Sequence, residues 1–217
     1  MAKKINRSTR LWASAMHEAG HAVIHCFLGI PDLREVSIEQ KKNSLGRMNV
    51  FSPQTFDSEL GRKIYLRKRA VICMAGFVFE EMARKNHRAE PSDTDLLGCI
   101  EAASFLKEDV PEEPTEKDLF FFWLEHPFSL SAIRRAKWLR DKTGLGSIVS
   151  QFATELYFRR TIDGRSAMTV IDDLLGRNEN WLPCRWDREN AKHKKNATCM
   201  KVVLIDGQTL TIEDRRT

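Results

Sequence analysis

Residues 17–21 read His-Glu-Ala-Gly-His, a pentapeptide whose residue types and spacing could hold a metal ion and activate a water molecule. On an α-helix, His17 and His21 lie one turn apart on the same face, so both imidazoles can reach one ion. Glu18 lies beside His17, where its carboxylate could take a proton from a metal-bound water. Two nitrogen ligands and one carboxylate base are the outline of a zinc hydrolase centre with one Zn²⁺ ion.

The residues around this pentapeptide predict the helix that it needs. Apolar residues recur from Leu11 to Phe27 with the spacing of one buried helix face. Ser8 and Thr9 are candidate N-caps, and Gly29 is a candidate C-terminal stop. The pentapeptide is therefore expected in the middle of a helix, not in a loop.

A catalytic zinc ion takes three protein ligands, and the pentapeptide supplies two of them. His25 is not a candidate for the third, because it lies about 12 Å from His17 along the helix axis. It is expected to be a core or supporting histidine. No histidine follows at the H-E-x-x-H-x-x-G-x-x-H spacing, so the third ligand is expected to be a carboxylate from elsewhere in the chain. The candidates are Glu80, Glu81, Asp93 and Asp95.

Each candidate carboxylate also has a purely structural interpretation. Ser92 to Asp95 has the form of a capping box, in which Asp95 satisfies helix N-terminal amides. Asp93 could complement the helix dipole, and Glu80 and Glu81 could be surface charges beside an apolar stripe. The spacing alone does not choose among the four.

The composition of the whole chain narrows the class of protein. Its 217 residues are 42% hydrophobic and 30% charged, which is typical of a globular protein with one sizeable core. The net charge is +5, but the basic segments lack interleaved aromatic residues, so no nucleic-acid partner is expected.

No apolar run is long enough for a membrane span and no secretory signal is apparent, so a cytoplasmic protein is expected. The five cysteines are scattered without a C-x-x-C pair, which argues against a disulfide scaffold or a cysteine-rich zinc module.

The remaining pattern predicts a mainly α fold with a small β-hairpin or sheet beside the metal helix. The aromatic run 119–124 is interpreted as the buried start of a helix, with a substrate-facing lid as the less favoured alternative. Asp206-Gly207 predicts a C-terminal hairpin, which is expected to add to a sheet edge here or in a neighbouring molecule. Residues 1–180 are expected to form one domain, followed by a linker and hairpin extension at 181–217. The expected strands are 36–39 and 48–51, and the expected helices are 57–85, 92–105, 130–142, 148–160 and 166–175.

Three stretches carry a resemblance to a known family. The run M-H-E-A-G-H-A-V with the following L-R-E-V-S-I…L-G-R-M resembles the peptidase domain of FtsH-type ATP-dependent zinc metalloproteases. Residues 74–81 are similar to the family's L-G-G-R-A-A-E-E, although Ala75 and Phe77 replace its glycine and arginine. Residues 94–96 are similar to the N-D-[IL] that opens the family's aspartate helix, and the likeness extends roughly over residues 8–175.

The resemblance implies a helical, zincin-like FtsH peptidase fold with His17, His21 and Asp95 as zinc ligands. It also implies Glu18 as the general base and Glu80 as a residue that could orient a histidine. The sequence contains no G-x-x-x-x-G-K-[ST] phosphate loop and no membrane segment, so ATP-driven unfolding is not expected to accompany the fold. We therefore expect an ATP-independent zinc metallopeptidase that cleaves unfolded proteins or peptides, with its oligomeric state open. The alternative is a non-catalytic protein-interaction module that keeps this fold, with or without the zinc.

Overall fold

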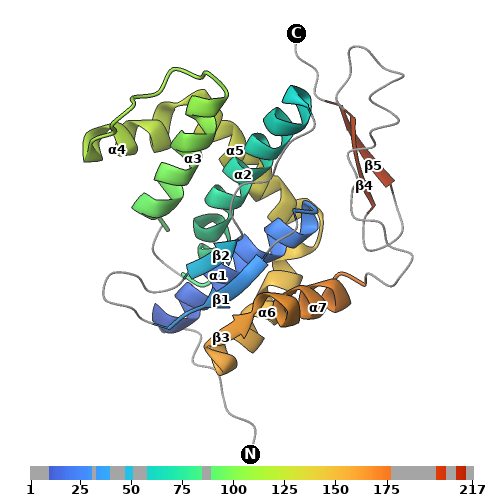
Figure 1. Ribbon diagram of the computed structural model, residues 1–217. Coiled ribbons are helices and arrows are strands. Elements are labelled where there is room, and N and C mark those ends of the chain that lie inside the picture. Colours follow the sequence, from blue (N-terminus) through green and yellow to red (C-terminus); the bar gives the residue numbers. More distant parts are fainter. Residues whose placement is uncertain are drawn as a thin grey trace, which may run out of the picture.

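The structure is a computed structural model that describes residues 10–30, 33–39, 47–50, 58–84, 89–176, 199–203 and 209–213 (Figure 1). Over these residues the chain is mainly helical with short antiparallel strands, as the sequence predicts. In chain order the elements are α1 (Arg10–Phe27), β1 (Leu33–Ser37), β2 (Arg47–Val50), α2 (Glu59–Glu80), α3 (Asp93–Phe105), α4 (Glu116–Glu125), α5 (Pro127–Lys142), α6 (Leu145–Arg159), β3 (Thr161–Asp163), α7 (Gly164–Leu174), β4 (Cys199–Val203) and β5 (Thr209–Glu213).

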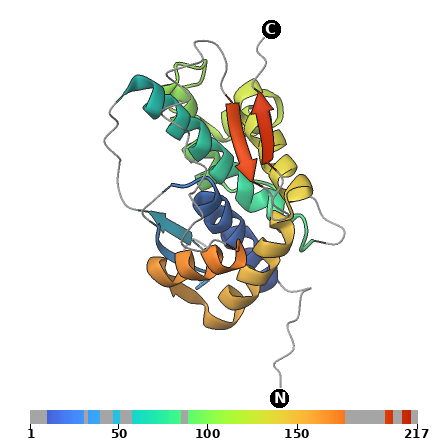
Figure 2. The same cartoon turned by 90° about the vertical axis from the view of Figure 1, so that its right-hand side faces the viewer.

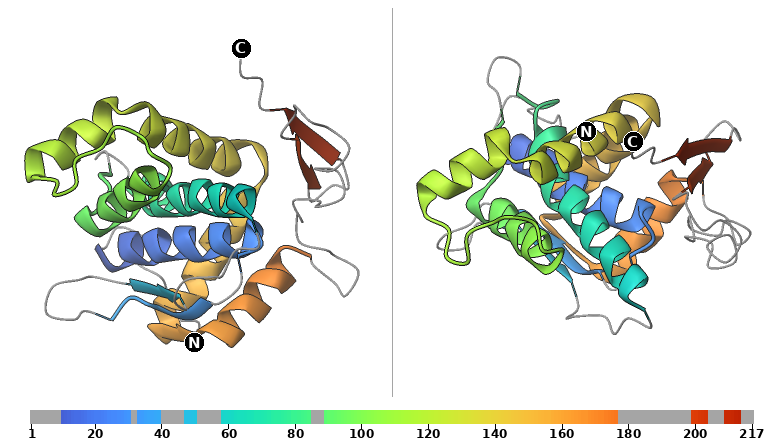
Figure 3. Two further views of the ribbon diagram at one scale, coloured as in Figure 1. Left: turned by 45° about the horizontal axis from the view of Figure 1, so that its top comes forward. Right: turned by 90° about the horizontal axis from the view of Figure 1, so that it is seen from above.

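The helices stack in successive layers around α1. In the left view of Figure 3, α5 lies over α2, α2 lies over α1, and α1 lies over the strands β1 and β2. Helix α6 also packs against α1, and Figure 2 shows it beside α7 on the same side of the molecule. Helix α1 is thus covered on several sides, and its polar residues Glu18, His21 and His25 are buried with its apolar ones.

Helices α1 and α2 approach each other closely because small residues line their contact. A Cβ atom built on Gly20 of α1 would lie 3.0 Å from the carbonyl oxygen of Ala75 and 3.0 Å from Cβ of Phe79, both on α2. Such contacts are tighter than packed side chains normally make, so this crossing requires glycine at position 20. The close approach brings the backbone of α2 next to the histidine-bearing face of α1.

The starts of α2 and α3 follow from capping residues in the sequence. Ser58 Oγ accepts a hydrogen bond from the amide of Gly61 at 3.0 Å and begins α2. Ser92 Oγ accepts one from the amide of Asp95 at 3.2 Å, while the Asp95 carboxylate accepts from the amide of Ser92. The capping box expected at residues 92–95 is therefore confirmed.

The small sheet contains one more strand than the sequence predicts. Its order is β2-β1-β3, and β1 pairs antiparallel with both neighbours. The expected hairpin of β1 and β2 is confirmed, whereas β3 was not expected. Arg160, expected at the end of a helix, instead has a φ of 69° and turns the chain from α6 into β3. Three residues are too short for a periodic signal, and β3 is stabilised by pairing with β1.

The aromatic run is partly core and partly exposed. In α4, Leu119, Phe122 and Trp123 are buried, whereas Phe120 and Phe121 are about half exposed. Trp123 stacks edge-on against the buried Phe77 of α2 with ring centroids 6.5 Å apart. The predicted buried helix is thus confirmed for one face of α4.

Strands β4 and β5 pair antiparallel in a sheet of their own, which confirms the C-terminal hairpin. Among the described strands they do not extend the sheet of β1, so the expected addition to a sheet edge of this molecule is not met. The candidate caps Ser8 and Thr9 and the turn residues Asp206 and Gly207 lie outside the described residues.

Candidate metal centre

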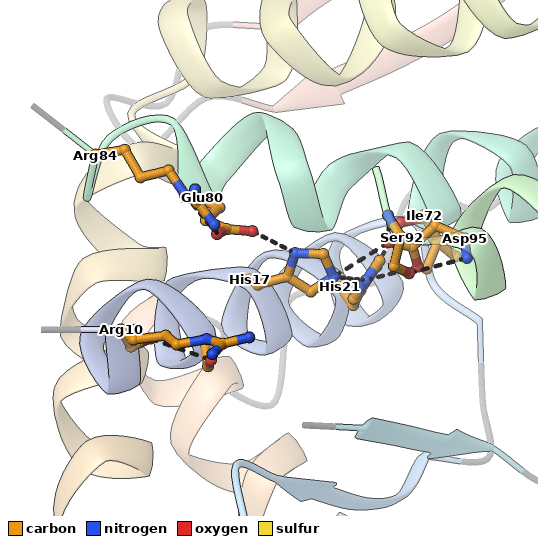
Figure 4. Close-up of polar contacts among 9 residues, drawn as sticks. Arg10, His17, His21, Ile72, Glu80, Arg84, Ser92 and Asp95 are labelled. Carbon is orange, nitrogen blue, oxygen red and sulfur yellow. Dashed lines mark hydrogen bonds and ion pairs between the residues drawn. The ribbon is translucent and has the colours of Figure 1, made fainter. Parts of the chain in front are cut away.

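The two histidines of the pentapeptide meet on the face of α1 that lies against α2 and α3 (Figure 4). Their Nε2 atoms are 3.1 Å apart, and their rings are inclined at 77° with centroids 4.7 Å apart. His21 is buried, while the side chain of His17 keeps 13% of its surface exposed. The predicted placement of both imidazoles in mid-helix is confirmed, and their Nε2 atoms point at a common position.

Asp95 completes the cluster from the first turn of α3. One carboxylate oxygen, Oδ2, lies 3.1 Å from Nε2 of His17, and the other, Oδ1, lies 3.1 Å from Nε2 of His21. The same carboxylate closes the capping box with Ser92. From the sequence, helix capping and metal binding are alternative roles for Asp95. In the structure, its side chain caps α3 and also contacts both histidines.

The other candidate carboxylates do not reach the Nε2 atoms. Glu81 forms ion pairs with Lys137 and Arg140 of α5, and Asp93 is exposed at the start of α3. Glu80 contacts His17, but at Nδ1 on the opposite side of the ring. Of the described histidines, cysteines and acidic residues, one group has ligand atoms close enough to hold an ion: His17, His21 and Asp95.

Hydrogen bonds on the far sides of both rings fix their orientation. His21 Nδ1 is 2.7 Å from the carbonyl oxygen of Ile72, and His17 Nδ1 is 2.9 Å from Oε2 of Glu80. Because a carbonyl oxygen can only accept, Nδ1 of His21 carries the proton, and in the neutral ring Nε2 then presents a lone pair. A carboxylate imposes the same arrangement on His17. Both imidazoles are thus prepared to be ligands through Nε2.

The space between the donor atoms fits a small cation. Donors bonded to zinc at 2.0–2.1 Å in a tetrahedron are about 3.3 Å apart, close to the 3.1 Å separations seen here. Gly76 of α2 forms the floor of this space. A Cβ atom built on Gly76 would lie 2.3 Å from Nε2 of His21 and 2.6 Å from Nε2 of His17. Glycine therefore leaves open a position that lies near bonding distance from both nitrogens.

The charges of the cluster also call for a cation. Three buried carboxylates, of Glu18, Glu80 and Asp95, lie at the site. Among the described residues that form ion pairs with them, Arg84 is the one permanent cation. With both imidazoles neutral, three negative charges and one positive charge leave −2, which a single divalent ion balances. Buried charges without such compensation are costly.

In the metal-free chain, protons supply part of this compensation. Burial opposes the charging of His17, but its hydrogen bonds to Asp95 and Glu80 outweigh that effect and raise its pKa to about 10. Burial likewise opposes the charging of His21, yet the Asp95 carboxylate raises its pKa. Burial alone would raise the pKa of Asp95, but the facing histidines hold it well below its ordinary range.

Glu18 is buried beside the cluster, with 7% of its surface exposed. Burial raises its pKa, an effect that the nearby charges of His17 and His21 oppose. A carboxylate whose pKa lies above its ordinary value is a better proton acceptor near neutral pH. Glu18 thus lies next to the histidines, as predicted, and its buried environment suits a general base.

Sequence reasoning missed two residues of the site, Gly76 and Arg84, and a backbone contribution from Ile72. Ile72, Gly76 and Glu80 are spaced four residues apart, so they form one stripe of α2 that faces α1. This spacing, repeated from Glu80 backwards, is the signal that could have identified Gly76. His25 is buried on α1, outside the metal-binding group.

Comparisons with known proteins do not assign the chain to a family. No protein-family model matches the sequence, and no significantly similar curated protein is found. Within the part of the chain that the structure describes, no helix is both long and apolar enough to cross a membrane.

Proposed function

We propose that the chain is a zinc-dependent metallopeptidase in which His17, His21 and Asp95 hold one Zn²⁺ and Glu18 is the general base. The observation that carries the proposal is the convergence of two histidines and one carboxylate: the two Nε2 atoms lie 3.1 Å apart over Gly76, and each lies 3.1 Å from one oxygen of Asp95. The resemblance of the pentapeptide and of residues 74–81 and 94–96 to the FtsH-type peptidase domain supports the same ligands. Two imidazoles and one carboxylate also suit iron(II), so elemental analysis of the purified protein identifies the metal.

Bound zinc would lower the pKa of a coordinated water to about 7 and polarise the scissile carbonyl. The residues of the chain would do the rest. Glu18 accepts the proton of the attacking water and delivers it to the leaving amine, which its raised pKa favours. His17 and His21 keep their orientation through their Nδ1 hydrogen bonds.

The sheet beside α1 offers a place for an extended substrate. Strand β2 lies at an edge of the described sheet, and both β1 and β2 contact α1. An extended peptide could pair with this edge through main-chain hydrogen bonds, which set its register without demanding a particular sequence. We therefore propose unfolded proteins or peptides as substrates, cleaved without ATP.

The decisive experiment compares the native chain with Glu18→Gln for zinc content and for cleavage of casein. Gln keeps the shape of the side chain but cannot accept the proton, so zinc should be retained while cleavage falls at least about a hundredfold. Glu155→Gln, at an exposed position on α6, is the matched control and should behave as the native chain. Zinc binding without cleavage by the native chain would instead favour a non-catalytic interaction module. Absence of bound zinc would contradict the peptidase, whereas the interaction module is compatible with either result.

A further inference from the structure

Arg84 contacts the metal centre indirectly, through Glu80. Its Nε and Nη2 atoms lie 2.7 and 2.5 Å from Oε1 of Glu80, while Oε2 of the same carboxylate lies 2.9 Å from Nδ1 of His17. Figure 4 shows the side chains of Arg84, Glu80 and His17 following one another from the end of α2 toward α1. The two oxygens of Glu80 are thus divided, one to the guanidinium and one to the imidazole.

We propose that Arg84 is a positioning residue of the metal centre, acting on His17 through Glu80. The side chain of Glu80 has 9% of its surface exposed, whereas that of Arg84 has 42%. A carboxylate so nearly buried needs donors for both oxygens to keep one orientation. Without Arg84, Oε1 loses the guanidinium that donates to it, and Glu80 can turn away from His17 toward water.

The position of Arg84 in the chain makes this contact part of the fold. Helix α2 ends at Glu80, and a turn follows in which the amide of Ala83 donates to the carbonyl of Glu80 at 2.9 Å. This turn places Arg84 next to the carboxylate. Sequence spacing alone would describe a surface ion pair at a helix end, which is a weak interaction. What distinguishes this pair is that its acidic partner also holds a proposed zinc ligand.

The chain offers a matched control for an ordinary ion pair. Arg159 and Glu155 of α6 have the same i,i+4 spacing, with Arg159 Nε 3.2 Å from Oε2 of Glu155, and both side chains are about half exposed. Their contact involves none of the metal-site residues. Arg159→Gln therefore removes a comparable pair without touching the site.

This role rests on the proposed zinc site, and zinc affinity measured with a competing chromophoric chelator tests both. Loss of a group that orients a metal ligand typically weakens binding about ten- to a hundredfold. We expect that range for Glu80→Gln and about three- to tenfold for Arg84→Gln, which acts one contact farther away. Arg84→Lys should lie within about twofold of the native chain, because an ammonium can still donate to Oε1. Arg159→Gln should match the native chain.

The double variant decides whether Arg84 acts through Glu80. If it does, adding Arg84→Gln to Glu80→Gln should cause no further loss of affinity, and the visible spectrum of the Co²⁺-loaded single variants should shift in the same direction. Equal affinities for Arg84→Gln and Arg159→Gln, or additive losses in the double variant, would overturn the positioning role alone. Failure of the native chain to bind zinc would overturn the proposed function and this role with it.

Discussion

Gly76→Ala is the substitution that most directly tests whether the donor atoms converge on a metal position. The added methyl group would lie 2.3 Å from Nε2 of His21, 2.6 Å from Nε2 of His17 and 2.7 Å from Cε1 of His21. These distances are about 1 Å shorter than a carbon–nitrogen van der Waals contact. The two distances to nitrogen are only a few tenths of an ångström longer than zinc–nitrogen bonds. The methyl would therefore occupy the space that the ion needs.

The cost to metal binding should greatly exceed the cost to folding. Overpacking typically lowers the free energy of unfolding by about 1–3 kcal/mol. Alanine has a higher helix propensity than glycine, which raises that free energy by about 1 kcal/mol. The net loss of unfolding free energy should thus be about 0–2 kcal/mol. Both histidines must move to relieve the contact, so zinc affinity should fall at least about a hundredfold, or about 2.7 kcal/mol.

The assay combines chelator competition for zinc with thermal unfolding of the metal-free protein. Gly146→Ala, on α6, is the control. Its methyl group would lie 3.2 Å from the flexible end of the Met82 side chain and would not contact the histidines. It should leave zinc affinity unchanged. A folded Gly76→Ala protein that binds zinc as tightly as the native chain would refute the convergence of the donor atoms over Gly76.

Two further predictions concern the ligands themselves. Asp95→Asn should weaken zinc binding, whereas Asp93→Asn should leave it unchanged. The assay is the amount of zinc that stays bound after dialysis, and the reverse result would assign the third ligand to Asp93. Because the pKa of His17 is raised to about 10 in the metal-free chain, zinc must displace a proton. Calorimetry in buffers of different ionisation enthalpy should show proton release at pH 7.5, and affinity should keep rising with pH toward 10. A raised histidine pKa stabilises the metal-free fold below pH 6.5 and loses that contribution toward pH 10, so its melting temperature should fall over that range. An affinity that levels off near pH 7 would contradict the shift.

The first helix and the placement of His17 and His21 on one of its faces were predictable because both depend on local spacing. His17 and His21 share a helix face by periodicity alone, and the apolar pattern around them marks the helix. The start of α3 followed from Ser92 and Asp95 for the same reason. Such signals lie within a few residues of one another, so no tertiary contact is needed to interpret them.

The choice of Asp95 could not come from spacing. Asp95 follows His21 by 74 positions in the sequence, and tertiary packing alone brings the two together. Asp93 and Asp95 lie in the same turn, so their place in the sequence does not distinguish them. Glu80 and Glu81 differ by one position, or about 100° around the helix. That rotation turns Glu80 toward His17 and Glu81 toward Arg140 of α5. Which neighbour lies on which side is a property of the packed helices.

The proposed ligands lie on α1 and α3 and are supported by α2, and this arrangement bears on what a bound metal would do for the protein. His17 and His21 are held by hydrogen bonds to α2, and Asp95 is held by the capping box of α3. The surrounding helices bury an extensive apolar core of their own, so we expect the fold to form without the ion, unlike that of small zinc modules. A site that is formed before the ion binds spends little of the binding energy on ordering the chain. It also keeps Glu18 at a fixed place beside the ligands, which is the condition for proton transfer in a hydrolytic reaction. The preorganised site and the buried carboxylate of Glu18 therefore support the proposal that the metal is catalytic and not purely structural.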